Sequence, residues 1–232
     1  MAFHYSPKIV TDDLVLYLDT ANTKSFINTT IGWEDLTGKY EALKMSGSTY
    51  VNEVSGAINF NALPGSSAST TVSFISNKEM SWDVWFNRTS STNLFNMVFS
   101  HIGLPYLAFR SSVNDNKFLF SWAATGQQLL SSPLPGLDNT WYNVVCTLIQ
   151  DTVATTSTAK MYVNGVLVST TTTGVGTVTS VVPTDKLRIA NYTNAGTYPF
   201  NGKISNLKVY NKILTAPDIL QNFNALKSRF GL

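Results

Sequence analysis

The chain has 232 residues, of which 44% are hydrophobic and 13% are charged, and its formal net charge is +2. This length and apolar fraction predict one large domain with a well-filled core. The charge is too small and too scattered to predict nucleic-acid binding. Residues 1–10 lack the apolar stretch of a signal peptide, and no apolar run reaches the roughly 18 residues of a membrane span. We therefore expect a protein that is made in the cytoplasm and does not enter a membrane.

The N-terminal half predicts an extended arm followed by short strands. Residues 1–12 contain a proline and show no clear period, which is typical of an arm. Apolar or alternating segments then alternate with loops rich in Gly, Pro, Ser and Asn. They predict strands at residues 14–19, 54–61, 80–88, 94–100, 106–110 and 117–123. Alternation within 80–88 places Trp82 and Phe86 on one face and Trp85 on the opposite, more polar face.

The clearest local signal is the stretch formed by residues 141–150 and 159–168, in which alternating apolar runs flank the Asn164-Gly165 pair. Asn and Gly tolerate the positive φ angles that a type I′ turn requires, so this segment predicts a β-hairpin. Residues 169–179, rich in Thr and Gly, fit either an exposed strand or a mobile loop. Two more strands are predicted at residues 186–190 and 203–210.

A helix is predicted near the C-terminus. Thr215 fits the N-cap, Pro217 is tolerated in the first turn, and Asp218 favours the positive end of the helix dipole. The expected inward stripe is Ile219, Leu220, Phe223 and Leu226.

Many short strands with one terminal helix predict an all-β protein, an antiparallel β-sandwich. We divide the chain into an N-terminal arm (1–12), a sandwich (13–214) and a short C-terminal helix with its tail (215–232).

Candidate catalytic residues are few. His4 lies in the predicted arm and His101 in a predicted turn, and neither accompanies a nucleophile motif. Glycoside hydrolysis needs two carboxyl groups that flank one bond. Glu79 and Asp83 are four residues apart on one predicted strand, so they could share a face. The alternative is that both are edge or loop carboxylates facing water.

The sequence assigns no metal site and no cofactor. The single cysteine, Cys146, lies in an apolar strand and is expected to be a buried core residue. Asp19, at the end of the first strand, is the best single candidate for a metal ligand. Neither an EF-hand loop nor a set of zinc ligands is present.

Aromatic residues suggest a ligand-binding site. Tyr192, Tyr198 and Phe200 lie in a loop that also contains Gly and Asn. Exposed aromatic rings beside amides are typical of sugar binding, because a sugar ring stacks on the aromatic face. Tyr192 and Tyr198 are therefore the candidate ligand-binding residues. The alternative for Phe200 is that it plugs the end of the sandwich. Trp82, Trp122 and Trp141 are expected in the core.

Several motifs in order resemble laminin-G-like, concanavalin A-like domains. They are Trp-Tyr-Asn-Val-Val at 141–145, Met-Tyr-Val-Asn-Gly-Val-Leu-Val at 161–168, Gly-Ala-Ile-Asn-Phe at 56–60, Met-Ser-Trp-Asp-Val-Trp-Phe at 80–86 and the segment 200–219. The resemblance covers about residues 13–220 and implies the concanavalin A-like jelly roll. Segments 9–25, 33–38 and 221–232 are similar to laminin-G-like proteins of tailed-phage virions.

Two departures from the family pattern bear on chemistry. Many relatives have Asp-Glu in the last strand, where the Asp helps to hold calcium, but this chain has Ser205 and Asn206. Asp19 keeps its place, so a calcium site stays open. The Glu-x-Asp-x-x-Glu motif of the laminarinase branch is absent, which argues against hydrolysis.

The resemblance implies a non-enzymatic phage virion structural protein, displayed on the particle surface as a capsid decoration protein with weak glycan binding. The alternatives are a glycan-binding adhesin of a tail or fibre, and a glycoside hydrolase. Expected partners are the major capsid protein or other virion proteins, sister subunits of a homo-oligomer and a host-surface glycan. Residues 1–12 and 213–232 are the expected contacts with the shell.

Overall fold

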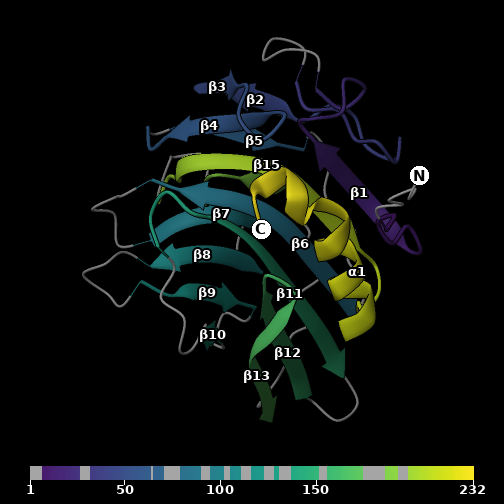
Figure 1. Ribbon diagram of the computed structural model, residues 1–232. Coiled ribbons are helices and arrows are strands. Elements are labelled where there is room, and N and C mark those ends of the chain that lie inside the picture. The colour runs from purple at the N-terminus through teal and green to yellow at the C-terminus, as the bar shows by residue number, and fades with distance from the viewer. Residues whose placement is uncertain are drawn as a thin grey trace.

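The computed structural model describes residues 7–26, 32–63, 65–70, 79–89, 95–101, 105–110, 116–122, 128–130, 137–151, 156–174, 186–192 and 198–232. The described strands form two antiparallel sheets (Figure 1). The first sheet contains β1 (Leu14–Asp19), β3 (Ser48–Val51), β4 (Ala57–Asn61), β6 (Glu79–Arg88), β11 (Trp141–Asp151), β12 (Thr156–Val163), β13 (Val166–Gly174) and β15 (Asn201–Tyr210). The second contains β2 (Lys44–Ser46), β5 (Ser67–Ser69), β7 (Phe95–His101), β8 (Tyr106–Arg110), β9 (Phe118–Ser121), β10 (Gln128–Leu130) and β14 (Leu187–Ile189).

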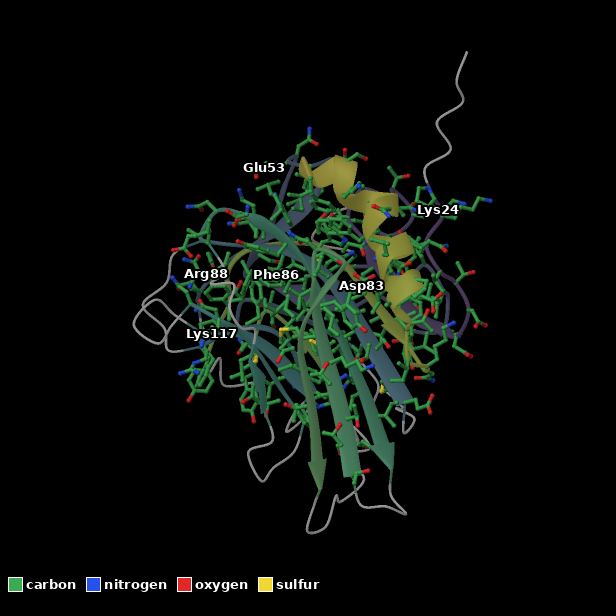
Figure 2. All side chains as sticks on the ribbon, turned by 60° about the horizontal axis from the view of Figure 1, so that its bottom comes forward. Lys24, Glu53, Asp83, Phe86, Arg88 and Lys117 are labelled. Atoms are coloured by element: carbon green, nitrogen blue, oxygen red, sulfur yellow. The ribbon has the colours of Figure 1, made fainter. Side chains whose placement is uncertain are left out.

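The first sheet has the order β13-β12-β11-β6-β15-β4-β3, and β1 pairs with β15 beyond the end of β4. The second sheet has the order β10-β9-β8-β7-β14-β5-β2. Their facing sides enclose one large apolar core, in which Trp82, Phe86 and Phe99 have at most 1% of their surface exposed. Phe86 lies in this interior in Figure 2. The predicted all-β sandwich is therefore confirmed.

The central hairpin is also confirmed. Val163 pairs with Val166, so Asn164 and Gly165 form a two-residue turn between β12 and β13. Their φ angles are 50° and 79°, the positive values that favour Asn and Gly at these positions. Residues 169–179 were expected to form either an exposed strand or a mobile loop. Their described part, up to Gly174, belongs to strand β13.

Other local predictions need correction. The predicted strand at 54–61 begins at Ala57, because Val54 and Ser55 have positive φ angles of 45° and 64°. Strands β2, β3 and β5 were not predicted, since each is only three or four residues long. His101 is a fully buried residue of β7, 6.3 Å from the Trp82 ring, and not a turn residue.

The C-terminal helix α1 (Ala216–Leu226) continues into the 3-10 helix η2 (Lys227–Phe230). Thr215 caps α1 as predicted: its hydroxyl accepts from the Asp218 N–H, and the Asp218 carboxylate accepts from the Thr215 N–H. The predicted inward stripe is only partly right. Ile219 is fully buried, but Leu220 is 48% exposed and Asn222 is buried in its place.

Helix α1 lies over the outer face of the first sheet, as Figure 1 shows. A second apolar cluster joins the two: Ile219 and Leu214 pack with Val145 of β11 and Tyr210 of β15. The described part of the predicted arm joins this layer, because the Val10 N–H donates to Asn222 at 2.8 Å. Residues 1–6 lie outside the described residues, and so does His4. Within the described part of the chain, no helix is long and apolar enough to cross a membrane.

Candidate functional site

The outer face of the first sheet carries a buried polar cluster under α1. Asp83 of β6 accepts hydrogen bonds from the side-chain amides of Asn143 at 2.7 Å and Asn222 at 3.0 Å. Lys208 of β15 forms an ion pair with the same carboxylate at 3.3 Å. Asp83, Asn143 and Lys208 are fully buried, and Asp83 lies beside the helix in Figure 2.

This cluster removes the basis for a Glu79–Asp83 catalytic pair. Glu79 is exposed at the start of β6, whereas the Asp83 carboxylate is paired, hydrogen-bonded and covered by the helix. A general acid or nucleophile must reach the scissile bond. Asp83 has no such access, so these two residues do not form the carboxylate pair that glycoside hydrolysis requires.

Aromatic rings cover the neighbouring part of the same face. Trp85 of β6 stacks on Phe230 with a centroid distance of 4.0 Å and on Phe223 at 5.7 Å. The expectation that Trp85 lies on the more polar face of its strand is met, but the C-terminal segment shields it completely. Trp141 was expected in the core and instead lies half-buried on this outer face, 4.9 Å from Phe230. Trp82 and Trp122 are core residues as expected.

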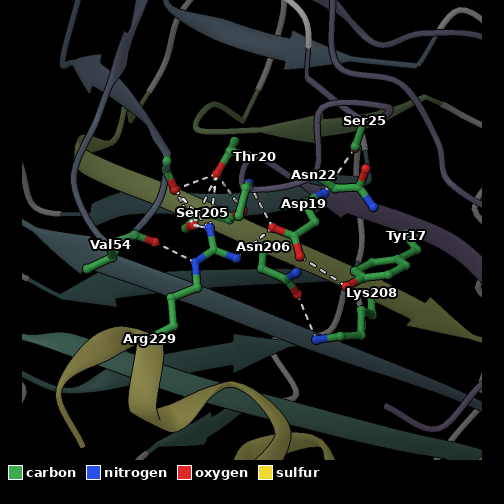
Figure 3. A network of polar contacts seen from close by, with 12 residues as sticks. Tyr17, Asp19, Thr20, Asn22, Ser25, Val54, Ser205, Asn206, Lys208 and Arg229 are labelled. Atoms are coloured by element: carbon green, nitrogen blue, oxygen red, sulfur yellow. Dashed lines mark hydrogen bonds and ion pairs between the residues drawn. The ribbon is translucent and has the colours of Figure 1, made fainter. Parts of the chain in front are cut away.

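The C-terminal segment also inserts Arg229 into a group of oxygen atoms (Figure 3). Its Nη1 donates to the Asp19 carboxylate at 2.6 Å, and its Nε donates to the Val54 carbonyl at 2.5 Å. Its Nη2 donates to the Gly56 carbonyl at 2.9 Å and to the Ser205 hydroxyl. The planar guanidinium thus donates hydrogen bonds to acceptor oxygens from three separate segments of the chain.

The backbone beneath Arg229 adopts a rare conformation. Val54, Ser55 and Gly56 have successive positive φ angles of 45°, 64° and 130°. Positive φ is unfavourable for a β-branched residue such as valine. A Cβ at Gly56 would lie 2.6 Å from the Thr20 carbonyl oxygen, so only glycine fits there. The two carbonyl groups that accept hydrogen bonds from Arg229, those of Val54 and Gly56, belong to this segment of positive φ.

The structure therefore gives Asp19 a protein partner. Besides Arg229, Asp19 accepts from the Tyr17 hydroxyl at 3.0 Å and from the Ala21 N–H at 3.0 Å. Burial, and then the adjacent Asp19 carboxylate, raise the pKa of Tyr17 well above its usual value. Among the described residues, no group of three or more His, Cys, Asp or Glu side chains could hold a metal ion. Cys146 is a buried core thiol, as expected, and burial raises its pKa.

The predicted ligand-binding residues lie together on the second sheet. The rings of Tyr192 and Tyr198 are 6.2 Å apart, and two further rings extend the group: Tyr106 lies 5.6 Å from Tyr192, and Phe95 lies 5.3 Å from Tyr198. All four rings meet edge to face. Tyr198 is 39% exposed and the others are half-buried. We call Phe95, Tyr106, Tyr192 and Tyr198 the aromatic surface.

Hydrogen bonds fix the aromatic surface on its sheet. The Ser100 hydroxyl of β7 donates to the Asn191 carbonyl at 2.8 Å, and the Tyr192 N–H donates to the Asn191 side chain at 2.8 Å. Tyr198 has a positive φ of 58°, and its carbonyl accepts from the Met97 N–H. Burial, followed by the neighbouring tyrosines, raises the pKa of Tyr192.

Phe200 does not belong to this surface. It is fully buried in the core, 6.0 Å from the Phe86 ring. The alternative in which Phe200 plugs the sandwich is therefore correct. Tyr106 and Phe95, conversely, were not among the predicted site residues, although both begin predicted or observed strands. Their alternation onto the outer face was the available signal.

Comparison with known proteins agrees with this architecture. A family model described as the Concanavalin A-like lectin/glucanases superfamily matches residues 62–220. No curated protein sequence matches the chain. Among solved structures, domain 4 of AbnA, a GH43 extracellular arabinanase from Geobacillus stearothermophilus in complex with arabinotriose, is similar at 15% identity and a TM-score of 0.61, covering 90% of this chain and 98% of that one.

Two other similar structures are parts of larger chains. The binding domain of Paraclostridial Mosquitocidal Protein 1 has 14% identity and a TM-score of 0.68, over 92% of this chain and 52% of that one. Trypanosoma rangeli sialidase with sialic acid has 13% identity and a TM-score of 0.68, over 97% and 36%. At these identities the likeness concerns the fold. Since the family model covers more than half of the sequence, the chain belongs to the concanavalin A-like lectin/glucanases superfamily.

Proposed function

We propose that this chain is a non-catalytic glycan-binding module and that the aromatic surface is its contact with sugar. The observation that carries the proposal is the convergence of Tyr106, Tyr192 and Tyr198 on one partly exposed site. Tyrosine rings offer an apolar face for a sugar ring and a hydroxyl for its polar groups. The solved structures with this fold include a domain in complex with arabinotriose and the binding domain of a mosquitocidal protein, which supports a binding role.

The first sheet supports the non-catalytic part of this proposal. The part of its outer face that carries β6 is covered by α1 and η2, with Trp85 stacked on Phe223 and Phe230. Asp83, one of the two carboxylates that suggested hydrolysis, is enclosed in the same layer. A sugar chain therefore has access to the aromatic surface on the second sheet, and not to Asp83 on the first.

The test is binding of purified protein to a panel of bacterial surface polysaccharides, measured by calorimetry or on a glycan array. Tyr192→Ala and Tyr198→Ala are each expected to weaken binding about 10-fold, the effect of losing one aromatic contact. Tyr50→Ala is the matched control, because Tyr50 on the first sheet is 40% exposed, like Tyr198, and packs against another aromatic ring, that of Phe26. Equal losses for Tyr50→Ala and Tyr198→Ala would reject the aromatic surface as the site.

We propose further that the module is displayed on the surface of a phage particle, as a decoration of the capsid. The support is the resemblance of segments 9–25, 33–38 and 221–232 to virion proteins. Parts of the two segments expected to contact the shell are already buried within the chain. Residues 8–10 and the buried side of α1 pack against each other and against the sandwich. A shell contact would then use the opposite side of α1, which carries Leu220.

Quantitative mass spectrometry of purified particles and of tailless capsids tests this placement. Hundreds of copies per capsid are expected for a decoration protein. A handful of copies, lost together with the tail, would instead identify a tail or fibre adhesin. Absence from both preparations would reject the virion proposal and leave the glycan-binding proposal to its own test.

A further inference from the structure

A row of side chains connects the aromatic surface to a buried arginine. Ser69, Arg188, Ser100 and Tyr106 lie directly opposite one another on β5, β14, β7 and β8. Directly opposed residues of antiparallel strands point to the same face of a sheet. The residues next to them in sequence, such as Ile189 and Leu107, belong to the core, so this row is on the outer face. Arg188 and Tyr106 are two strands apart, which is about 10 Å.

Arg188 is close to the chain segment that carries Tyr192. Ser100, its direct neighbour on β7, donates through its hydroxyl to the carbonyls of Asn191 and Tyr192, at 2.8 and 3.3 Å. The segment that leaves β14 therefore folds back over the row and brings Tyr192 above Ser100. The arginine and the aromatic rings consequently border the same small region of the outer face.

Arg188 has an unusual environment for a charged residue. Only 5% of its surface is exposed, and its buried Nε has no hydrogen-bond partner. No acidic side chain of the described residues forms an ion pair with it. By contrast, the buried Lys208 of β15 and the partly buried Arg229 of η2 each pair with an aspartate. A buried charge without a partner is costly for the folded state.

The charge of the second sheet has one sign. Its seven strands contain the basic residues Lys44, Arg110 and Arg188 and not one Asp or Glu. The strands of the first sheet contain Asp19, Glu79, Asp83 and Asp151. The strands that carry the aromatic surface therefore bring basic and no acidic side chains to it, and the Nε donor of Arg188 is unused among the described residues.

We propose that the aromatic surface binds acidic glycans and that Arg188 binds the carboxylate of a uronic or sialic acid residue. This inference rests on the proposed glycan-binding function and specifies its ligand class. The sugar ring packs on Tyr192 and Tyr198, while its carboxylate supplies the charged partner that no described acidic side chain gives to Arg188. Guanidinium and carboxylate form charge-assisted hydrogen bonds that are stronger than neutral ones.

The experiment compares ligands that differ only in charge: polygalacturonate with its methyl ester, and sialyllactose with lactose. The expected result is binding of the acidic member of a pair about 10- to 100-fold more tightly, the effect of a hydrogen bond to a charged group. Arg188→Gln is expected to remove this preference and to leave the weaker binding of the neutral member. Lys24→Gln, which removes one exposed charge elsewhere (Figure 2), controls for general attraction and should keep the preference.

A second measurement separates a binding role from a structural one. Because Arg188 is buried and has no acidic partner among the described residues, Arg188→Met should raise Tm while it removes the preference for acidic ligands. A fall in Tm would mean that the arginine serves the fold, and it would overturn the inference. Equal affinity for acidic and neutral ligands would overturn it and leave the proposed function intact. Binding to none of the glycans would overturn both.

Discussion

A single side chain, Arg229, joins the end of the described chain to its beginning. It links Asp19, 210 positions earlier, to the Ser205 hydroxyl and to the carbonyls of Val54 and Gly56. The Arg229 and Asp19 side chains are 11% and 9% exposed. Removing one member of such a buried pair leaves the other charge without compensation, which costs more than the pair contributes.

Arg229→Ala is therefore expected to lower the free energy of unfolding by about 3 kcal/mol. Arg229→Lys should recover roughly half of this loss, because an ammonium keeps the charge but cannot reach several oxygen atoms in one plane. Urea denaturation at pH 7 measures both variants. A loss below about 1 kcal/mol for Arg229→Ala would show that solvent replaces the guanidinium without difficulty.

The sequence was informative about one half of this contact. Asp19 stands out because it ends an apolar strand, and a search for cation ligands therefore finds it. That Arg229 is the positively charged partner of Asp19 could not be predicted from the sequence, because Arg229 lies in a C-terminal tail whose position depends on the complete sandwich. The aromatic surface shows the same limit. Tyr192 and Tyr198 share a loop and were predicted together, whereas Tyr106 joins them only through the pairing of β7 with β8.

At the scale of elements, the C-terminal segment covers the central part of the outer face of the first sheet, around Trp85 and Tyr210. Helix α1 contacts the central hairpin at its turn, since a Cβ on Gly165 would lie 3.2 Å from the Phe223 ring and 3.3 Å from Leu220. The same turn thus fixes the register of β12 and β13 and receives the helix. The hairpin was predictable from Asn164-Gly165 alone. The contact with the helix was not, because it needs the helix orientation that Asn222 and its buried partners determine.

Gly165→Ala tests this contact. Alanine at a φ of 79° costs about 1 kcal/mol in backbone energy, and the added methyl must also displace Phe223 or Leu220. Gly38→Ala is the matched control, with a φ of 69° and open space around the added Cβ. Thermal unfolding should show a clearly larger fall in Tm for Gly165→Ala. Equal shifts would mean that the helix adjusts freely.

Phe230→Ala tests how firmly η2 is attached. Phe230 is 7% exposed, stacks on Trp85 and meets the Trp141 ring at a tilt of 49°. Its truncation is expected to cost about 3 kcal/mol and to increase quenching of tryptophan fluorescence by iodide. Leu232→Ala, at a residue that is 47% exposed, should change neither quantity. Unchanged quenching in Phe230→Ala would show that the segment stays closed without its aromatic anchor.

At the scale of the whole molecule, tyrosines buried outside the main core make the stability of the fold depend on pH in the alkaline range. Tyr210 is fully buried, its hydroxyl donates to the Val10 carbonyl at 3.0 Å, and burial followed by the nearby Asp83 raises its pKa well above 10. The folded protein therefore keeps this proton at a pH where the unfolded chain, with an ordinary tyrosine pKa near 10, releases it. The contribution is complete below pH 10 and decreases above it.

We expect the free energy of unfolding to fall above pH 10 by about 1.4 kcal/mol per pH unit for Tyr210, with Tyr17 acting in the same direction. In Tyr210→Phe the slope should be smaller by that amount, whatever the change in absolute stability. Urea titrations between pH 9 and 11 measure the slope, with Tyr50→Phe as the control at an exposed tyrosine. The same slope in Tyr210→Phe and the parent would contradict the assignment.

The position of β1 in the first sheet has a consequence for synthesis. Among the described strands, β1 pairs only with β15, and Asp19 meets Arg229 from 210 positions later. At about 5–20 residues per second, a ribosome synthesises Arg229 roughly 10 to 40 s after Asp19. During this time the apolar β1 is an unpaired edge that chaperones or neighbouring chains can bind. Nascent chains stalled with residue 200 outside the tunnel should accordingly remain protease-sensitive, and those that expose residue 230 should become resistant.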